Sequence, residues 1–155
     1  MLQSINRGVL FVIQRFQEFM SGITVCYKYL QRIKNYQMTE LGLKGIHVSC
    51  LFYLHNCPDG LTATQLCNLC CEDKATISRT VADLREKGYI EPSTGKSYRA
   101  VLRLSEAGEA VAKQMEPMIE SWVSAGGEGL TDEQREVFYQ CLGMISENLK
   151  EKLEQ

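Results

Sequence analysis

The feature that most constrains the fold is a change in the period of the hydrophobic pattern at Gly88. Before this residue, apolar side chains recur at steps of three and four, the spacing of one helix face. Over residues 98–104 they alternate with polar residues, and Arg99 and Arg103 fall on the outer face. With residues 89–91 before it and turn-forming residues 92–96 between, this segment predicts a β-hairpin with a basic outer face.

Two short helices are predicted before the hairpin. Thr62 and Gln65 have the spacing of a capping box at the start of the first helix. Asp73 is a suitable N-cap for the second, and Gly88 is suited to its end. The second helix is expected to bury Ile77, Val81 and Leu84. Two short helices joined by a tight turn and followed by a hairpin are typical of a winged helix-turn-helix.

Longer helices flank this lobe in the sequence. An apolar stripe from Leu2 to Ile33 predicts a long amphipathic helix, which Gly8 and Gly22 weaken by about 1 kcal/mol each. Between this long helix and the helix pair, a further helix is expected over 43–56. Its inward-facing residues are expected to be Ile46, Cys50, Tyr53 and Leu54.

Two more helices are expected after the hairpin. Ser105 caps the first, which Pro117 should kink or split, and Thr131 with Gln134 opens the last. The expected fold is mainly α with a small β-hairpin wing. We expect dimerisation helices at 1–40 and 106–155 around a DNA-binding lobe at 41–105, because the terminal stripes need more apolar partners than one lobe offers.

The second helix of the pair is the candidate recognition helix. Its exposed side is predicted to carry small, hydroxyl and basic side chains, which suit contacts with base edges and phosphates. The DNA-binding residues expected on the two helices and the wing are Thr62, Thr64, Lys74, Ala75, Thr76, Ser78, Arg79, Lys96, Ser97 and Arg99.

Charge is distributed unevenly along the 155 residues, whose net charge is −2. Residues 1–60 carry six basic and three acidic side chains, 61–104 carry seven and five, and 105–155 carry four and eleven. A polycationic, histone-like protein is excluded, and an anion-binding surface is expected before residue 105.

The motifs of the lobe resemble those of the MarR (multiple antibiotic resistance regulator) family. The matching stretches are 61–67, 73–90 and 98–108, with Leu-Arg-Glu-Lys-Gly-Tyr-Ile and Leu-Ser-Glu-Ala-Gly in the family's order. The resemblance implies a bacterial homodimeric repressor that binds palindromic double-stranded DNA and is released by a small effector. The family's wing often carries Asp-x-Arg-Arg; Arg99 matches the last arginine, and the aspartate is missing.

A small aromatic acid is the expected effector. Tyr29, Tyr36 and His47 place polar groups on otherwise apolar segments where the long first helix meets the lobe, a mixture suited to a ligand pocket. The alternative is that both tyrosines are core or rim residues.

Seven cysteines without a secretion signal indicate reduced thiols. Cys26, with Lys28 and Arg32 nearby, is the candidate for a redox-sensing regulator of the same fold. Cys67, Cys70 and Cys71 contain a Cys-x-x-Cys spacing, but a structural zinc site needs a second pair, so we expect no metal and no cofactor.

Other functions are less well supported by the sequence. No nucleophile, base and acid occur at motif spacing, so an enzyme is not expected. The apolar run 9–13 is too short for a membrane span or signal peptide, which indicates a cytoplasmic protein without membrane contact. A winged helix used for protein–protein contacts remains the alternative from another class.

Overall fold

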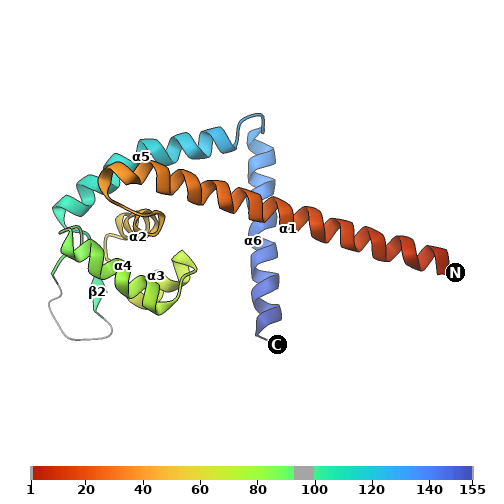
Figure 1. The fold of residues 1–155 in the computed structure, drawn as a ribbon, viewed down its shortest axis with the longest axis horizontal. Helices are drawn as coiled ribbons and strands as arrows, with labels where there is room; N and C mark the ends of the chain where they lie inside the picture. The colour runs from red at the N-terminus through yellow and green to blue at the C-terminus, as the bar shows by residue number, and fades with distance from the viewer. Residues whose placement is uncertain (1, 93–99, 155) are drawn as a thin grey trace. The chain divides into compact units, whose positions relative to one another are not determined.

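The computed structural model describes residues 2–92 and 100–154, with the backbone only for 2–9, 37 and 40. It divides into two compact units, residues 1–113 and 114–155, each of which is considered by itself. Among the described residues, the helices are α1 (Leu2–Met38), α2 (Gly45–His55), α3 (Ala63–Cys70), α4 (Lys74–Glu86), α5 (Glu106–Gly126) and α6 (Asp132–Leu153), with a 3₁₀ turn at Thr39–Leu41. The mainly helical fold predicted from the sequence is confirmed (Figure 1).

The core of the first unit forms where α2 packs against the end of α1, α3 and α4 (Figure 1). The most deeply buried apolar side chains come from each of these helices: Met38, Cys50, Leu51, Leu66, Ile77 and Leu84. The inner positions expected for α4 are confirmed, and Thr80 is buried with them. On α2 the expectation was partly wrong, because Ile46 and Tyr53 are only half-buried, whereas His47, Val48 and Leu51 are buried.

The start of α2 is held by side chains of α1 and by its own first turn. The N–H of Gly45 donates to Oδ1 of Asn35 at 2.7 Å, and the N–H of Lys44 donates to Nδ1 of His47 at 3.1 Å. A Cβ at Gly45 would lie 3.1 Å from that Asn35 oxygen and 3.2 Å from Oε1 of Gln31. The two helices therefore approach each other closely at a residue without a side chain.

The β-structure ties both ends of the predicted hairpin to the rest of the lobe. Strand β2 (Val101–Leu102) pairs antiparallel with β1 (Leu61–Thr62), and Ile90 pairs with Leu104. The N–H of Glu91 donates to the carbonyl of Arg103 at 3.0 Å, as expected at the base of a hairpin. Leu102 and Leu104 are buried while Val101 and Arg103 are exposed, which confirms the alternation over these residues. Of the turn expected at 92–96, residues 93–96 lie outside the described residues, as do Ser97, Tyr98 and Arg99.

The C-terminal helices begin and end largely where the sequence predicts. The Ser105 hydroxyl donates to the Gly88 carbonyl at 2.5 Å and accepts from the N–H of Gly108 at 3.1 Å. The capping box of Thr131 and Gln134 at the start of α6 is confirmed. The expected split at Pro117 is not found, because α5 continues as one helix through it. A proline removes its own N–H from the helix and crowds the carbonyl four residues earlier, but the remaining hydrogen bonds of a 21-residue helix can keep it continuous.

None of the helices in the described part of the chain combines the length and apolar character needed to cross a membrane.

Candidate nucleic-acid interface

The start of α4 is fixed by a network of three polar side chains. The Asp73 carboxylate accepts from the backbone N–H of Thr76 at 2.8 Å and from its hydroxyl at 3.1 Å. These hydrogen bonds, the backbone one first, lower the pKa of Asp73, and Arg79 acts in the same direction. Nη2 of Arg79 lies 3.5 Å from the Thr76 hydroxyl oxygen. Asp73 therefore belongs to the helix cap, and Arg79 extends from a defined position one turn further along.

The exposed side of α4 carries the residue types expected for a DNA-reading surface. Lys74, Ala75, Ser78 and Arg79 are exposed, and Thr76 is half-buried. The first turn contains no acidic residue. Asp83 and Glu86 lie on the second half, so the positive charge is concentrated toward the beginning of the helix. Small side chains there leave room for close approach to a groove.

Helix α3 contributes two threonines with different surroundings. The Thr62 hydroxyl accepts from the N–H of Gln65 at 3.3 Å, and the N–H of Thr62 donates to the side-chain oxygen of Gln65 at 2.8 Å, which confirms the capping box. Thr64 is exposed. Thr62 therefore has a structural role in the lobe, whereas Thr64 is placed on its surface.

The wing residues Lys96, Ser97 and Arg99 lie outside the described part of the chain. Arg103 lies directly after β2 and is exposed, a basic residue that the site prediction omitted. The signal for it was present, since Arg103 shares the outer face with Arg99 in the alternating pattern.

The structure does not bring the three candidate ligand-binding residues together within one chain. Helical spacing places Tyr29 and Tyr36 away from the face of α1 that meets α2, and Tyr36 is 83% exposed. His47 is only 2% exposed, and its Nε2 lies 3.5 Å from Oδ2 of Asp83. Burial lowers the pKa of His47, although Asp83 opposes this effect.

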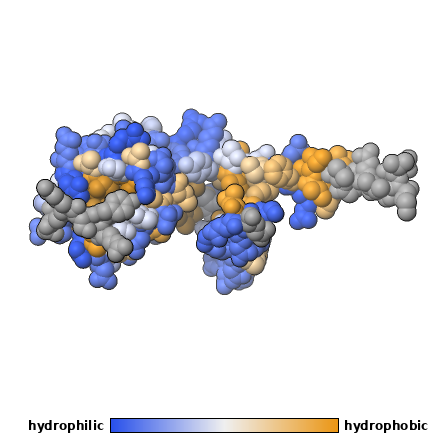
Figure 2. Space-filling view, turned by 90° about the horizontal axis from the view of Figure 1, so that it is seen from below, coloured by the Kyte–Doolittle hydropathy of each residue, from blue (hydrophilic) through white to orange (hydrophobic). Residues whose placement is uncertain are grey.

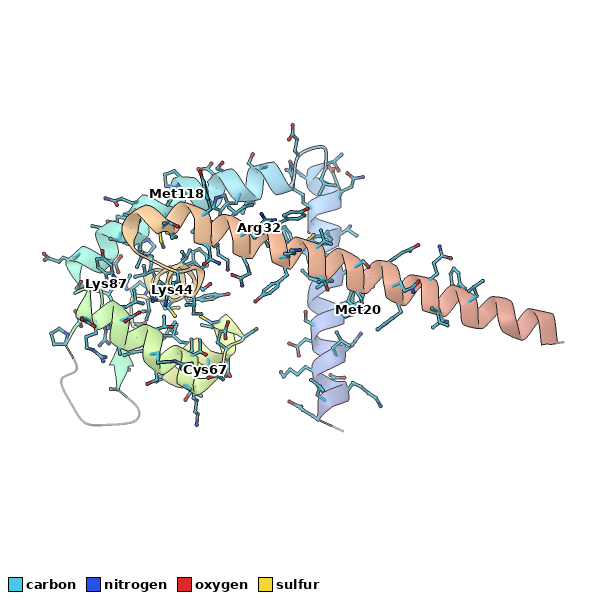
Figure 3. The ribbon with its side chains drawn as sticks, in the orientation of Figure 1. Met20, Arg32, Lys44, Cys67, Lys87 and Met118 are labelled. Carbon is cyan, nitrogen blue, oxygen red and sulfur yellow. The ribbon has the colours of Figure 1, made fainter. Side chains whose placement is uncertain are left out.

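The candidate redox residue Cys26 is exposed on α1. Cys67 and Cys70 are half-buried and Cys71 is exposed at the end of α3, and Figure 3 labels Cys67 on that helix. Among the residues that the structure describes, no group of three or more histidine, cysteine or acidic side chains is arranged to hold a metal ion.

Helices α3 and α4, with β1 before them and its partner strand β2 after them, define a winged helix-turn-helix. Residues 41–96 match the model of the MarR family. Residues 41–96 are therefore similar to the MarR family, in agreement with the resemblance seen in the sequence.

Solved structures share this fold over most of the chain. The transcriptional regulator SlyA has a TM-score of 0.78 at 20% identity, covering 88% of this chain and 96% of that one. A MarR protein from Peptoclostridium difficile has a TM-score of 0.77 at 19% identity, covering 86% and 88%. A putative MarR family transcriptional regulator from Listeria monocytogenes, complexed with a 26mer DNA, has a TM-score of 0.73 at 20% identity, covering 86% and 89%. A search of curated proteins found no match.

Proposed function

We propose that the chain is a sequence-specific, double-stranded DNA-binding transcriptional regulator that reads its operator with α4. The observation that carries this proposal is the first half of α4, where Lys74 and Arg79 stand among small exposed side chains with no acid in the first turn. The Listeria neighbour, of the same fold, is complexed with DNA. The proposal assigns the chain no enzymatic activity.

We assign base contacts to some of these residues and phosphate contacts to others. Arg79 and Ser78 face base edges, where arginine pairs well with guanine and serine with several bases. Lys74, Thr64 and the wing residues Lys96, Ser97 and Arg99 contact phosphates, which position the protein without reading sequence. Thr62, Ala75 and Thr76 line the same surface, with Thr62 and Thr76 also holding the helix starts.

Dimerisation is part of the proposal, with 1–40 and 106–155 as the dimerisation segments. Large apolar side chains are exposed along α1 from Leu10 to Ile33, and Figure 2 shows this hydrophobic surface in orange. On α6, Val137, Phe138, Met144 and Leu149 are also exposed. A surface of this extent is typical of a protein–protein interface, and a two-fold dimer matches a palindromic operator.

The experiment that tests DNA binding is selection of duplex fragments by the purified protein, followed by affinity measurements on a selected and a scrambled duplex. We expect tighter binding to the selected duplex and a steep loss of affinity with salt, with a slope of about 0.9 per phosphate contact. Weak binding with no preference at any salt concentration would instead favour a winged helix used for protein contacts.

Repression relieved by a small aromatic acid completes the proposal, supported by the family resemblance. Because His47 is buried and Tyr36 is exposed, a pocket using both requires the lobe to open or a second subunit to cover Tyr36. Titration of the DNA-bound protein with aromatic acids, repeated on His47→Ala and Tyr36→Phe, tests this part. If only thiol oxidation weakens binding, and Cys26→Ser abolishes that response, a redox switch at Cys26 replaces the effector.

A further inference from the structure

Two thiols from different helices meet beneath the helix-turn-helix. Cys50 lies on α2 and is completely buried, and Cys70 is the last residue of α3 and half-buried. Their sulfur atoms are 3.9 Å apart. Twenty residues separate them in the sequence, so their proximity depends on the packing of α2 against α3.

The surroundings make the two thiols chemically unequal. The two thiols share a hydrogen bond in which either sulfur can be the donor, and this bond, together with the positive charge of Lys34, lowers the pKa of Cys70. Burial and Glu72 oppose that effect. The same hydrogen bond and burial raise the pKa of Cys50. Cys70 is therefore the thiol that ionises first, and it is also the one that solvent reaches.

Lys34 is held close to this pair by the end of α1. Its ammonium group donates to the Ser49 hydroxyl at 3.3 Å, one residue before Cys50. Burial lowers the pKa of Lys34, while Cys70 and Glu72 raise it. A half-buried lysine beside a half-buried thiol is a typical setting for a reactive cysteine.

We propose that Cys50 and Cys70 are a dithiol that a hydroperoxide oxidises to an intrachain disulfide. The Cys70 thiolate attacks the terminal oxygen of the hydroperoxide; an S–O bond forms, the O–O bond breaks, and the alkoxide takes up a proton and leaves as an alcohol. Cys70 is then a sulfenic acid. The Cys50 sulfur attacks the Cys70 sulfur and forms the S–S bond, and the released hydroxide takes the Cys50 proton to give water. Two electrons pass from the thiols to the hydroperoxide.

The disulfide changes the turn that leads into α4. An S–S bond is about 2.05 Å long, so the two sulfur atoms must approach from 3.9 Å. Cys71, the next residue, already has a left-handed backbone with φ of 53°, and Asp73 caps α4 two residues later. Drawing the end of α3 toward α2 therefore moves the turn that orients α4. The effect on DNA rests on the function proposed above, whereas formation of the disulfide does not.

Neighbouring cysteines provide the controls. Cys67 lies one helical turn before Cys70 on the same helix. Cys71 is exposed, and its S–H donates to the carbonyl of Asn68 at 3.6 Å. A serine at either position therefore removes a nearby thiol while leaving both Cys50 and Cys70 in place.

The chemical experiment treats the full reduced chain with cumene hydroperoxide and maps disulfides by peptide mass spectrometry without reduction. We expect a loss of two hydrogen atoms per chain and a cross-link between the peptides that carry Cys50 and Cys70. Cys50→Ala should leave a Cys70 sulfenic acid that dimedone captures, and Cys71→Ser should behave as the wild type. Cys70→Ser, at a half-exposed position that tolerates a hydroxyl, should give no cross-link and no dimedone adduct at α3. A link from Cys70 to Cys67, Cys71 or a second chain, or equal dimedone labelling of all seven cysteines, overturns the proposal.

The functional experiment measures affinity for the selected duplex before oxidation, after it and after dithiothreitol. We expect about a tenfold loss that dithiothreitol reverses, and no loss in Cys70→Ser. Unchanged affinity in a protein whose disulfide has been mapped overturns the link to α4. If the reduced protein prefers no duplex, the proposed DNA-binding function is overturned instead. The disulfide mapping tests formation of the Cys50–Cys70 bond independently of that result.

Discussion

The imidazole of His47 on α2 lies 3.5 Å from the carboxylate of Asp83 on α4, with the ring nitrogen Nε2 facing the oxygen Oδ2. The other ring nitrogen accepts a hydrogen bond from the N–H of Lys44, which requires Nδ1 to be unprotonated. Figure 3 labels Lys44 near the start of α2 and Lys87 at the end of α4, and both positive charges lower the pKa of His47 in addition to burial. The fold therefore favours a neutral His47, despite Asp83.

The free energy of unfolding should consequently decrease as the pH is lowered, and His47 should cause part of this decrease. The unfolded chain takes up a proton on this residue near pH 6.5, whereas the folded chain does so only at lower pH. Between these two values the unfolded state binds more protons, so the free energy of unfolding decreases as the pH falls, by at most about 1.4 kcal/mol per pH unit. Urea titrations of wild type and His47→Gln between pH 7.5 and 5 measure it. Parallel curves for the two proteins would contradict the assignment.

Arg79 should determine sequence preference, whereas Lys87 should not. Arg79→Ala should cost about 1 to 3 kcal/mol on the selected duplex and relax the preference at one position per half-site. Lys87→Ala removes the same charge at the far end of α4 and should preserve the preference. Fluorescence anisotropy with selected, single-mismatch and scrambled duplexes measures both. Equal losses on all duplexes for Arg79→Ala would show that this residue contacts phosphate only.

Alanine substitutions at Thr62 and Thr64 should have different effects, because Thr62 caps α3 whereas Thr64 is proposed to contact DNA. Thr62→Ala removes the acceptor for the N–H of Gln65 and should lower the free energy of unfolding by about 1 kcal/mol. Thr64→Ala, two residues later and exposed, should change stability by less than about 0.5 kcal/mol and weaken DNA binding. Denaturant titration and anisotropy on the same preparations test the pair, and a stability loss of equal size in both would refute the distinction.

A carboxylate on the apolar stripe of α1 should dissociate the dimer. Ile23→Asp places a charge where the partner is expected, at a cost of at least about 1.4 kcal/mol per subunit, so the dissociation constant should rise about a hundredfold. Ser21→Asp introduces the same charge on the other side of α1 and should leave assembly unchanged. Analytical ultracentrifugation over a concentration series distinguishes them. A folded wild-type monomer at micromolar concentration would remove the basis for the prediction.

Gly108 should be irreplaceable, and Gly22 should not. A Cβ at Gly108 would lie 2.0 Å from the carbonyl oxygen of Tyr89, a backbone atom that cannot turn aside. Gly108→Ala should therefore cost about 3 kcal/mol or more, as an overpacked site. Gly22→Ala meets nothing within 4 Å and should stabilise α1 by up to about 1 kcal/mol. Thermal unfolding of the two variants compares them, and a folded, equally stable Gly108→Ala would be inconsistent with this contact.

Local sequence signals predicted those parts of the fold that depend on neighbouring residues. The capping pairs at Thr62 and Thr131 and the end of α4 at Gly88 are set by residues within one helical turn, and the structure contains all three. Strand β1 was missed, because two residues become a strand only through pairing with β2, about forty residues later.

The burial of polar groups was harder to predict. Thr80 is buried because its hydroxyl donates to the carbonyl of Thr76 at 2.8 Å, and His47 because α4 brings Asp83 beside it. The Cys50–Cys70 contact likewise depends on how α2 crosses α3. By contrast, the surface side chains of α4 followed directly from helical spacing, because they are exposed among the residues that the structure describes.

The hydrogen bond between Asn35 and the first residue of α2 has a consequence for how this protein tolerates insertions. Gln31, Lys34 and Asn35 lie on the face of α1 that meets the lobe, next to the face that carries the apolar stripe, and both faces belong to one continuous helix that fixes the angle between them. One inserted residue between them rotates the lobe by about 100° around the helix axis, whereas seven change the angle by only about 20° while lengthening α1 by about 10 Å. If two chains join through the stripe, the number of residues between Ile23 and Asn35 thus sets both the distance and the rotation between the two copies of α4. Only insertions or deletions close to a whole number of helical turns preserve their relative orientation.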